Sequence, residues 1–414
     1  MRILFLTPQL PYPPRQGASL RNWGWLRELS NRHEVHLFTL LEDGQEDGLA
    51  AVRGQLASVT AVPVPARTTA RRAVQFVSTR TPDLALRLWS EEAAAMLART
   101  LDAIPCDIVQ VEGLELVPYA LPFARRSRAA WVYDAHNAEA ALQATICRAD
   151  LASPWRWPTG LYSLVQWHKL RAYEHSILPR FNGVVAVSEA DAWALEASTG
   201  VRPVVVPNGV DTQTLAPQAV APEPALGTHP ALVFTGKMDF RPNVDAVRWF
   251  ASEVLPRVRA RIPAARFWVV GQQPHRSLRG LRTRSGIEIV GAVPRIETYL
   301  VGAAVVVAPL RMGSGTRLKI LQALGLGRPV VATNLGASGL ELRDGVHVRL
   351  ADTAEAFAQA ILDLLEDPES ASTLSRAGRE HVAKRFDWRV LAPRLEALYS
   401  SILTKRKGSS GSDA

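Results

Sequence analysis

A glycine-rich segment followed by two basic residues carries the strongest chemical signal in this chain. Residues Ala308 to Gln322 read APLRMGSGTRLKILQ, which joins the end of an apolar strand to a glycine loop and a helix start. Glycines let the backbone approach an anion closely, and the free amides of a helix N-terminus point toward it. Arg317 and Lys319 oppose the helix dipole at that end, and a bound diphosphate would remove this conflict. The segment predicts a diphosphate-binding loop; an ordinary turn with basic side chains on the surface is the alternative.

A histidine follows a predicted strand in the first half of the chain. His136 lies in the sequence Asp134-Ala-His-Asn137, directly after the β-like segment Ala129–Asp134. Ligands of open α/β sheets bind at the carboxyl ends of the strands, so His136 is the best catalytic candidate in this half. The alternative is a histidine that caps or packs within the core. Asp134 is equally open to a structural interpretation, as a carboxylate that caps the loop after the strand.

Several motifs of familiar enzyme classes are missing from the sequence. It contains no G-x-G-x-x-G after the first strand, no G-x-x-x-x-G-K-[ST], no H-E-x-x-H and no G-x-S-x-G. These absences count against dinucleotide oxidoreductases, P-loop NTPases, zincins and α/β-hydrolases. No D-x-D occurs either, so the obvious metal clamp for a nucleotide diphosphate is missing. We therefore expect the protein itself to hold the anion, with no metal and no other cofactor.

The composition describes a globular protein with more than one core. The chain has 414 residues, of which 47% are hydrophobic and 21% charged, and this excludes long disorder, coiled coil and collagen-like architectures. Two domains are expected at this length. The longest nearly apolar stretch, Val301 to Leu310, is about half of what a membrane span needs, and no signal peptide is visible. Cys106 and Cys147 cannot form a disulfide framework, so a cytoplasmic protein is expected.

The basic charge indicates an anionic partner. Lysine and arginine outnumber aspartate and glutamate by 48 to 39, a net charge of +9. Such a charge suits nucleic acid, an acidic membrane face or a phosphorylated small molecule. Of these partners we expect the phosphorylated small molecule, and no nucleic acid.

A second basic segment mixes aromatic with charged residues. Within 153–177 these residues are Trp155, Trp157, Trp167, Arg156, Lys169 and Arg171. The mixture suits the surface of an anionic membrane and suggests peripheral contact with its inner face. The alternative is a helix packed on its domain with a solvated basic face.

Short apolar segments alternate with helical ones in both halves of the chain. The expected strands of the first half are Arg2–Thr7, Glu34–Leu41, Asp107–Glu112, Ala129–Asp134 and Gly183–Val187. Those of the second half are Leu232–Thr235, Phe267–Val270, Glu288–Val290, Ala304–Ala308 and Pro329–Ala332. The expected helices are Leu20–Ser30, Val244–Arg261, Thr316–Gly325 and Thr353–Glu366. Near-continuous apolar strands separated by helices indicate parallel sheets covered on both faces.

This alternation predicts an α/β protein with two doubly wound, Rossmann-like domains facing across a cleft. The first domain is expected at 1–209, a linker rich in proline and alanine at 210–230, and the second domain at 231–385. A C-terminal helix at 386–404 is expected to pack back toward the first domain, and the tail 405–414 to be disordered. Ligands should bind at the carboxyl ends of the strands, in the cleft.

Further motifs occur in an order that resembles a known family. The segment Gly313–Thr333 reads GSGTRLKILQALGLGRPVVAT and resembles the donor-binding loop and helix of retaining GT-B glycosyltransferases of family 4, the group 1 transferases. Other pieces agree in order: PYPPRQG at 11–17, DAHN at 134–137, VAVS at 185–188, VPNGVD at 206–211 and FTGKMDFRPNVD at 234–245. The resemblance spans nearly the whole chain and implies the GT-B architecture.

The resemblance also implies an activity and a set of site residues. The implied reaction moves a sugar from a nucleotide diphosphate sugar to a glycan or lipid-linked acceptor with retention, in exopolysaccharide or cell-surface glycan synthesis. The implied catalytic residues are His136, Lys237 and Arg317. The implied donor-binding residues are Gly17, Gly313, Ser314, Gly315, Thr316, Lys319 and Gln322. Gly17 lies in the first loop, where a simple turn glycine is the alternative.

Some positions depart from the family pattern. The family commonly carries two glutamates across this loop and helix, and the second normally grips the nucleotide ribose; this chain has Ser314 and Gln322 there. Gln322 can accept a hydrogen bond from a hydroxyl, but a neutral amide binds it more weakly than a carboxylate. Pro242 stands where the family usually has a second cation beside Lys237. Two alternatives stay open: a degenerate nucleotide-sugar-binding protein without turnover, and a UDP-sugar epimerase of GT-B fold.

Overall fold

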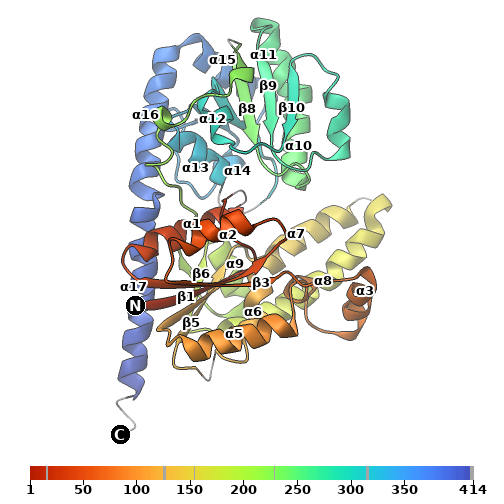
Figure 1. Cartoon of the computed structure of the whole chain (residues 1–414). Coiled ribbons are helices and arrows are strands. Elements are labelled where there is room, and N and C mark those ends of the chain that lie inside the picture. Colours follow the sequence, from red (N-terminus) through yellow and green to blue (C-terminus); the bar gives the residue numbers. More distant parts are fainter. Residues whose placement is uncertain (15–16, 125–126, 153, 228, 314–316, 411–414) are drawn as a thin grey trace. The chain divides into compact units, whose positions relative to one another are not determined.

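The computed structural model describes residues 1–14, 17–124, 127–152, 154–227, 229–313 and 317–410. The chain divides into two compact units, each with its own parallel sheet (Figure 1). The first unit comprises Met1–Pro207 together with the C-terminal segment Leu391–Ala414. The second comprises Asn208–Val390.

The first unit is built on a seven-stranded sheet whose paired strands are all parallel. The strands are β1 (Arg2–Thr7), β2 (Glu34–Leu41), β3 (Ser58–Pro63), β4 (Ile108–Glu112), β5 (Ala130–Ala135), β6 (Gly183–Ala186) and β7 (Val204–Val205). Their order is β3-β2-β1-β4-β5-β6-β7. The order reverses between β1 and β4, which is the kind of switch point where open sheets bind ligands.

Helices lie on both sides of this sheet, with α1 and α2 on one side and α5 and α6 on the other (Figure 1). The helices are α1 (Gly17–Ser30), α2 (Glu46–Arg53), α3 (Thr69–Ser78), α4 (Asp83–Leu86), α5 (Glu91–Ala103), α6 (Val117–Ala120), α7 (Glu139–Leu151), α8 (Trp157–Ile177) and α9 (Glu189–Thr199). The central strands are buried on both faces, which explains why their sequences are nearly continuous apolar runs.

The second unit repeats this plan with a six-stranded sheet, again with parallel pairing. The strands are β8 (Ala231–Thr235), β9 (Arg266–Val270), β10 (Ile287–Gly291), β11 (Val305–Ala308), β12 (Val330–Ala332) and β13 (Arg349–Leu350). Their order is β10-β9-β8-β11-β12-β13, so the switch point lies between β8 and β11. The fold class predicted from the sequence, two doubly wound α/β domains, is confirmed.

The helices of the second unit connect these strands. They are α10 (Arg241–Trp249), α11 (Leu255–Arg261), α12 (Glu297–Val301), α13 (Leu318–Gly325), α14 (Asn334–Ala337), α15 (Ala354–Glu366) and α16 (Pro368–Arg385). The single helix expected at Val244–Arg261 is interrupted by a π-helical turn at Phe250–Val254. Pro256 follows that turn and has no amide hydrogen for the regular helical bond, so the helix widens just before it.

The segment 210–230, for which the sequence predicts a linker, belongs to the second unit. Val210, Leu215, Val220 and Leu226 are buried in its core. The proline and alanine content suggests an exposed connection, but these four apolar side chains are more stable packed against the sheet than in water. These four residues are widely spaced among prolines and alanines, so the sequence gives no helical or strand-like pattern that would predict their burial.

The C-terminal helix α17 (Trp388–Ser410) extends beyond its expected end at residue 404. The prediction of a disordered tail from residue 405 is therefore wrong for 405–410. Arg406 donates hydrogen bonds to the carbonyl of Ala129 at 2.7 Å and to that of Ser127 at 3.3 Å. These bonds tie the last turns to the first unit and offset the weak helix preference of the glycine- and serine-rich end. Across the described ranges, no helix combines the length and apolar character that a membrane crossing requires.

Candidate functional site

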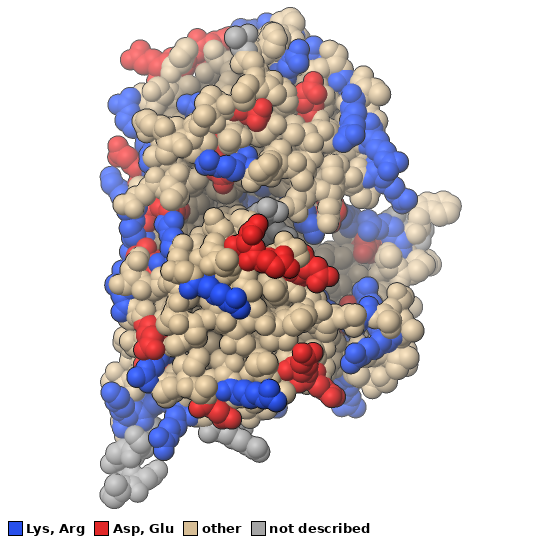
Figure 2. Space-filling view, viewed as in Figure 1, with Lys and Arg blue, Asp and Glu red and all other residues tan. Residues whose placement is uncertain are grey.

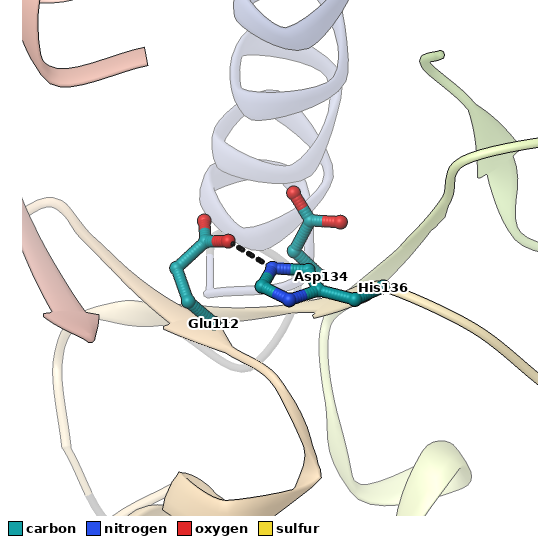
Figure 3. Close-up of side chains that lie close together, drawn as sticks. All are labelled: Glu112, Asp134 and His136. Atoms are coloured by element: carbon teal, nitrogen blue, oxygen red, sulfur yellow. Dashed lines mark hydrogen bonds and ion pairs between the residues drawn. The ribbon is translucent and has the colours of Figure 1, made fainter. Parts of the chain in front are cut away.

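Three titratable side chains meet at the carboxyl ends of two adjacent strands of the first sheet (Figure 3). Glu112 is the last residue of β4, and Asp134 is its partner in the register with β5. His136 follows directly after the end of β5. This edge of the sheet adjoins the switch point between β1 and β4, so the chain places an acid–base cluster where such sheets bind ligands.

His136 and Glu112 form a charge-assisted pair. The Nε2 atom of His136 lies 2.8 Å from Oε2 of Glu112, which is fully buried. Burial lowers the pKa of His136, but the hydrogen bond and the charge of Glu112 outweigh it, so the pKa lies above its usual value. Burial and the charge of Asp134 raise the pKa of Glu112. The two groups therefore share a proton-binding site at the strand ends.

A buried ion pair stands beside them. Arg21 of α1 directs Nε to Asp134 Oδ2 at 2.9 Å and Nη2 to Asp134 Oδ1 at 3.0 Å. Both side chains are almost completely inaccessible to water. Two parallel hydrogen bonds are the geometry in which a buried pair offsets the loss of hydration. The pair fixes α1 against β5 and gives Asp134 the structural role that the sequence had left open.

Further hydrogen bonds fix the orientation of Glu112. Its Oε1 accepts a bond of 2.7 Å from the amide of Gln110, and the hydroxyl of Tyr399 in α17 donates to Gln110. Burial holds the pKa of Tyr399 well above its usual range, so the phenol stays protonated as a donor. The amide nitrogen of Asn22, turned toward Glu112, donates to Oε2 at 2.8 Å. Both carboxylate oxygens are therefore occupied.

The same cluster is the place to consider a metal ion. One ligand atom each from Glu112, Asp134 and His136 lie within 4.8 Å of one another. However, Arg21 donates to both oxygens of Asp134, while Glu112 accepts from His136 and Gln110. A divalent cation would lie beside a guanidinium and replace these hydrogen bonds. The donor set fits a hydrogen-bonded acid–base network better than a metal centre.

Glu139, the first residue of α7, is a second acid–base candidate in this region. Burial raises its pKa to about 7, although Asn137 counteracts part of this rise by donating to Oε1 at 3.0 Å. His136 is close enough to interact with it electrostatically. A carboxyl group with such a pKa can both accept and release a proton near neutral pH.

The second unit places a lysine ammonium at its own switch point. Lys319, in the first turn of α13, has its Nζ atom 3.9 Å from the centre of the Phe234 ring of β8. The same atom lies 2.8 Å from Oδ1 of Asn243. The amide of Asn243 donates in turn to the carbonyl oxygen of Lys237 at 2.9 Å. These contacts hold the ammonium at the carboxyl end of β8.

This ammonium has no compensating negative charge among the residues that the structure describes. Burial and the positive charge of Arg317 hold the pKa of Lys319 well below its usual range. Among the described residues, no carboxylate lies within ion-pair distance of its Nζ atom. An anion bound here would raise the pKa again and stabilise the protonated lysine. The electrostatics of α13 therefore favour an anionic ligand.

Glycines allow the loops around Lys319 to come close together. A Cβ atom on Gly236 would lie 2.7 Å from the amide nitrogen of Asn243 and 3.2 Å from Nζ of Lys319, so a side chain would displace this pair. Gly313 has a φ of 106°, which glycine adopts without strain. The ring of Pro242 lies 3.3 Å from the position of a Cβ atom on Gly313. Pro242, which stands where a second cation was expected, therefore lies next to Gly313.

The other predicted residues of the second unit differ in their surroundings. Arg317 is buried directly before α13, and its Nη2 donates to the carbonyl of Gly313 at 2.8 Å, so it fixes the position of this glycine. The side chain of Lys237 is half exposed and pairs with Asp239 at 3.3 Å. Gln322 is buried, and within the described ranges its side chain makes no hydrogen bond. The structure thus joins Lys319, Arg317 and Gly313 at one helix start.

Two predictions concern positions elsewhere. Gly17 is the exposed first residue of α1, in the first unit. Ser314, Gly315 and Thr316 lie outside the described residues, so the middle of the glycine loop stays a prediction.

Several residues of the first cluster were missed by the sequence analysis. Glu112 carried a usable signal, since it ends a predicted strand next to the one that precedes His136. Arg21 and Tyr399 carried none, because a basic or aromatic residue within a helix does not reveal its distant partner. Tyr399 contacts Gln110 across 289 positions of sequence.

Two family models match the chain. The model described as Glycosyltransferase Family 4 matches residues 16–214, and the model described as Glycosyl transferases group 1 matches residues 229–367. The chain belongs to the family 4, group 1 glycosyltransferases. The first match contains the cluster around His136, and the second contains the glycine loop and Lys319.

Curated relatives of this glycosyltransferase act on phosphatidylinositol according to their names. A phosphatidyl-myo-inositol mannosyltransferase from Propionibacterium freudenreichii is 29% identical over 238 residues, which is 55% of this chain and 59% of the relative. The protein of that name from Mycobacterium tuberculosis (H37Rv) is 30% identical over 232 residues, covering 53% of this chain and 60% of the relative. The matches thus span about three fifths of the length of these relatives.

Solved structures share the fold over nearly the whole chain. Sucrose-phosphate synthase from Thermosynechococcus elongatus matches with a TM-score of 0.68 and 18% identity, covering 98% of this chain and 100% of that chain. HepE from Anabaena, solved with UDP and glucose, matches with a TM-score of 0.67 and 17% identity, covering 97% and 100%. The fold of this glycosyltransferase is therefore the GT-B fold.

Proposed function

We propose that this glycosyltransferase moves a sugar from a nucleotide diphosphate sugar to a lipid-linked or glycan acceptor with retention at the anomeric carbon. The observation that carries the proposal is the ammonium of Lys319, which lies beside Gly236 and lacks a carboxylate partner among the described residues. A diphosphate supplies the charge that this position lacks. The names of the phosphatidylinositol mannosyltransferases favour a lipid-linked acceptor and a role in cell-surface glycan synthesis.

In the proposed reaction, the second unit stabilises the leaving group. Negative charge grows on the diphosphate as its bond to the sugar breaks, and Lys237, Arg317 and Lys319 are the cations that would stabilise it. The acceptor hydroxyl attacks from the same face, and the leaving phosphate accepts its proton. Such electrostatic stabilisation is often the largest single contribution to catalysis.

The first unit would contribute positioning through His136. Glu112 raises the pKa of this histidine and fixes its ring by the 2.8 Å hydrogen bond. An imidazole held in this way can orient a hydroxyl of the sugar or the acceptor. We propose a metal-independent reaction, because cations of the protein take the place of a metal at the diphosphate and Arg21 already neutralises Asp134.

A panel of nucleotide diphosphate sugars tests the function. The chain is incubated with UDP-, GDP- and ADP-sugars, with a lipid-linked acceptor and without one, and each reaction is run both with and without a metal chelator. Transfer, or slow hydrolysis of the donor, supports the proposal. An epimerised nucleotide sugar would identify an epimerase instead, and binding without turnover would identify a degenerate binding protein. Activity that disappears only with the chelator would contradict the metal-independent mechanism.

Replacing Lys319 with methionine is expected to weaken binding of the nucleoside diphosphate by about 1.5–3 kcal/mol, with little effect on the nucleoside. The substitution removes the charge but keeps an unbranched side chain over the Phe234 ring. Isothermal titration of both ligands measures the difference. Lys384→Met, on the exposed surface of α16, removes a lysine elsewhere in the second unit and should change neither affinity.

The lowered pKa of Lys319 gives this test a second readout. Binding of a diphosphate should raise the pKa, so the wild-type protein should take up protons on binding at any pH that lies between the pKa of the free state and that of the bound state. Titrations in buffers of different ionisation enthalpy detect this uptake, which Lys319→Met should remove. Equal losses for nucleoside and diphosphate would show that Lys319 does not contact phosphate.

A further inference from the structure

The end of the hairpin formed by α7 and α8 exposes large apolar side chains to water. Trp155 is 95% exposed and Trp157 is 60% exposed. We define the hairpin tip as these two residues with the exposed Ile146, Leu151 and Leu161. In Figure 1 the two helices project from the first unit and are drawn in yellow, and in Figure 2 the projection ends in uncharged surface.

The side chains further along α8 are anchored in the first unit. Trp167 is partly buried and packs against the core of this unit. Lys169 donates from Nζ to the carbonyl of Phe76 at 2.6 Å. The two interpretations of this segment in the sequence therefore apply to different parts of it: the middle of α8 is packed on the domain, and the tip is not. Substitutions at the tip leave the anchoring contacts intact.

The charges near the tip have one sign at the surface. Arg148 and Arg156 are exposed beside the apolar residues. Asp150 is buried and pairs with Arg156 at 3.0 Å, and Glu174 of α8 is buried as well. Glu139, at the far end of α7, is partly buried. Helices α7 and α8, both within the described ranges, thus carry no fully exposed carboxylate.

Helix α3 adds a second apolar and basic element next to α8. Its Phe76 stacks on Tyr162 with ring centres 5.2 Å apart, which fixes α3 against α8. Val74 and Val77 remain exposed, and Arg71 lies one turn before Val74. The helix contains no acidic residue. The exposed apolar surface of the tip is therefore flanked by further apolar and basic side chains.

We propose that the hairpin tip inserts into the interface of an anionic lipid membrane. Tryptophan places its apolar ring at the level of the lipid headgroups, and arginines are attracted to anionic lipids. A lipid surface is more consistent with these observations than a protein partner, because the fully exposed charges of α7 and α8 are all basic, as an anionic membrane favours. The proposal rests on surface exposure and charge alone and stands independently of the sugar and nucleotide that the enzyme uses.

Co-sedimentation of the full chain with vesicles tests the proposal. One set of vesicles contains phosphatidylcholine only, and the other contains about one third phosphatidylglycerol. We expect binding to the second set and little binding to the first. Trp157→Ser should weaken the binding about tenfold, and the double variant Trp155→Ser/Trp157→Ser should weaken it further, since binding strength follows the apolar area that is inserted.

Matched controls test whether the loss of binding is specific to the hairpin tip or follows from removing any exposed tryptophan or changing the net charge. Trp193→Ser removes a tryptophan of similar exposure, 63%, from α9 of the same unit and should leave binding unchanged. Arg148→Glu should weaken binding to the anionic vesicles at least about fivefold. Arg53→Glu changes the net charge equally on the exposed surface of α2 and should have little effect.

Three outcomes would overturn the proposal. The wild-type chain could fail to bind anionic vesicles, or Trp157→Ser and Trp193→Ser could weaken binding equally. Self-association that depends on Trp155 and Trp157 in sedimentation velocity, without vesicle binding, would identify the tip as a protein interface instead. Circular dichroism and the thermal unfolding transition of each variant, compared with those of the wild type, confirm that the chain is folded.

Discussion

Replacing Asp134 with asparagine is expected to destabilise the first unit by about 3–5 kcal/mol, because it removes the negative charge that pairs with the buried guanidinium of Arg21. Arg21 is 1% exposed and Asp134 is 0% exposed, so water cannot hydrate the guanidinium in place of the carboxylate. Asparagine keeps nearly the same volume, so the loss reports charge and hydrogen bonding rather than a cavity. Hydrogen exchange of peptides from β4 and β5 in increasing denaturant measures the change for this unit alone.

Two further variants decide whether the buried charge is the cause. Arg21→Met/Asp134→Leu removes both charges and should recover most of the lost stability, since replacing a buried pair by apolar residues is often neutral. Glu34→Ala breaks the exposed pair with Arg2 and should cost about 1 kcal/mol or less. A double variant as unstable as Asp134→Asn would show that shape, and not charge, dominates at this position.

The arrangement of strands was largely readable from the sequence because their burial on both faces leaves long apolar runs. The strands that the sequence analysis missed, β3, β7 and β13, lack this signal. β3 is mostly half-buried, with the sequence SVTAVP, and β7 and β13 contain two residues each. Edge strands pack on fewer neighbours, so their composition is less constrained.

Site residues could be predicted from the sequence only where they follow a predicted strand. His136 and Lys319 follow strands at the carboxyl ends that the topology brings to the switch points. The partners that determine their chemistry come from elsewhere: Glu112 from the neighbouring strand, and Asn243 from a helix 76 positions earlier in the chain. Such contacts depend on tertiary packing, which motif spacing does not encode.

Replacing His136 with alanine is expected to lower kcat by a factor on the order of 10², because the sugar or acceptor is no longer positioned, and to leave nucleoside diphosphate affinity nearly unchanged. His136 belongs to the first unit, whereas the cations assigned to the diphosphate belong to the second. Steady-state kinetics with the donor identified by the panel give kcat, and isothermal titration gives the affinity. His175→Ala, an exposed histidine of α8 that bonds the carbonyl of Ser198, is the matched control and should change neither. Full turnover in His136→Ala would remove the residue from the mechanism.

Replacing Glu112 with glutamine should shift the pH dependence that belongs to His136. The carboxylate is what raises the pKa of this histidine against the effect of burial, so without its charge burial prevails and the pKa falls. The limb of the pH–rate profile that follows His136 should move to lower pH in Glu112→Gln. A change in the height of the profile with no movement of this limb would mean that Glu112 acts only through shape.

The same pair should make the stability of the first unit depend on pH. Because the folded-state pKa of His136 lies above its ordinary value of 6.5, the folded chain binds more protons than the unfolded chain between that value and the folded pKa. The stability that the pair contributes is fully present below pH 6.5 and is lost as the pH rises through the folded pKa of His136.

The raised pKa of Glu112 changes the stability in the same direction, since the folded state again binds more protons than the unfolded state. The free energy of unfolding of the wild-type first unit should therefore fall as the pH rises from 6.5 through the folded pKa of His136, and this decline should be smaller in Glu112→Gln. Hydrogen exchange of β4 and β5 across this pH range, corrected for the intrinsic rates, measures both slopes, and parallel slopes would show that the pair does not hold the proton.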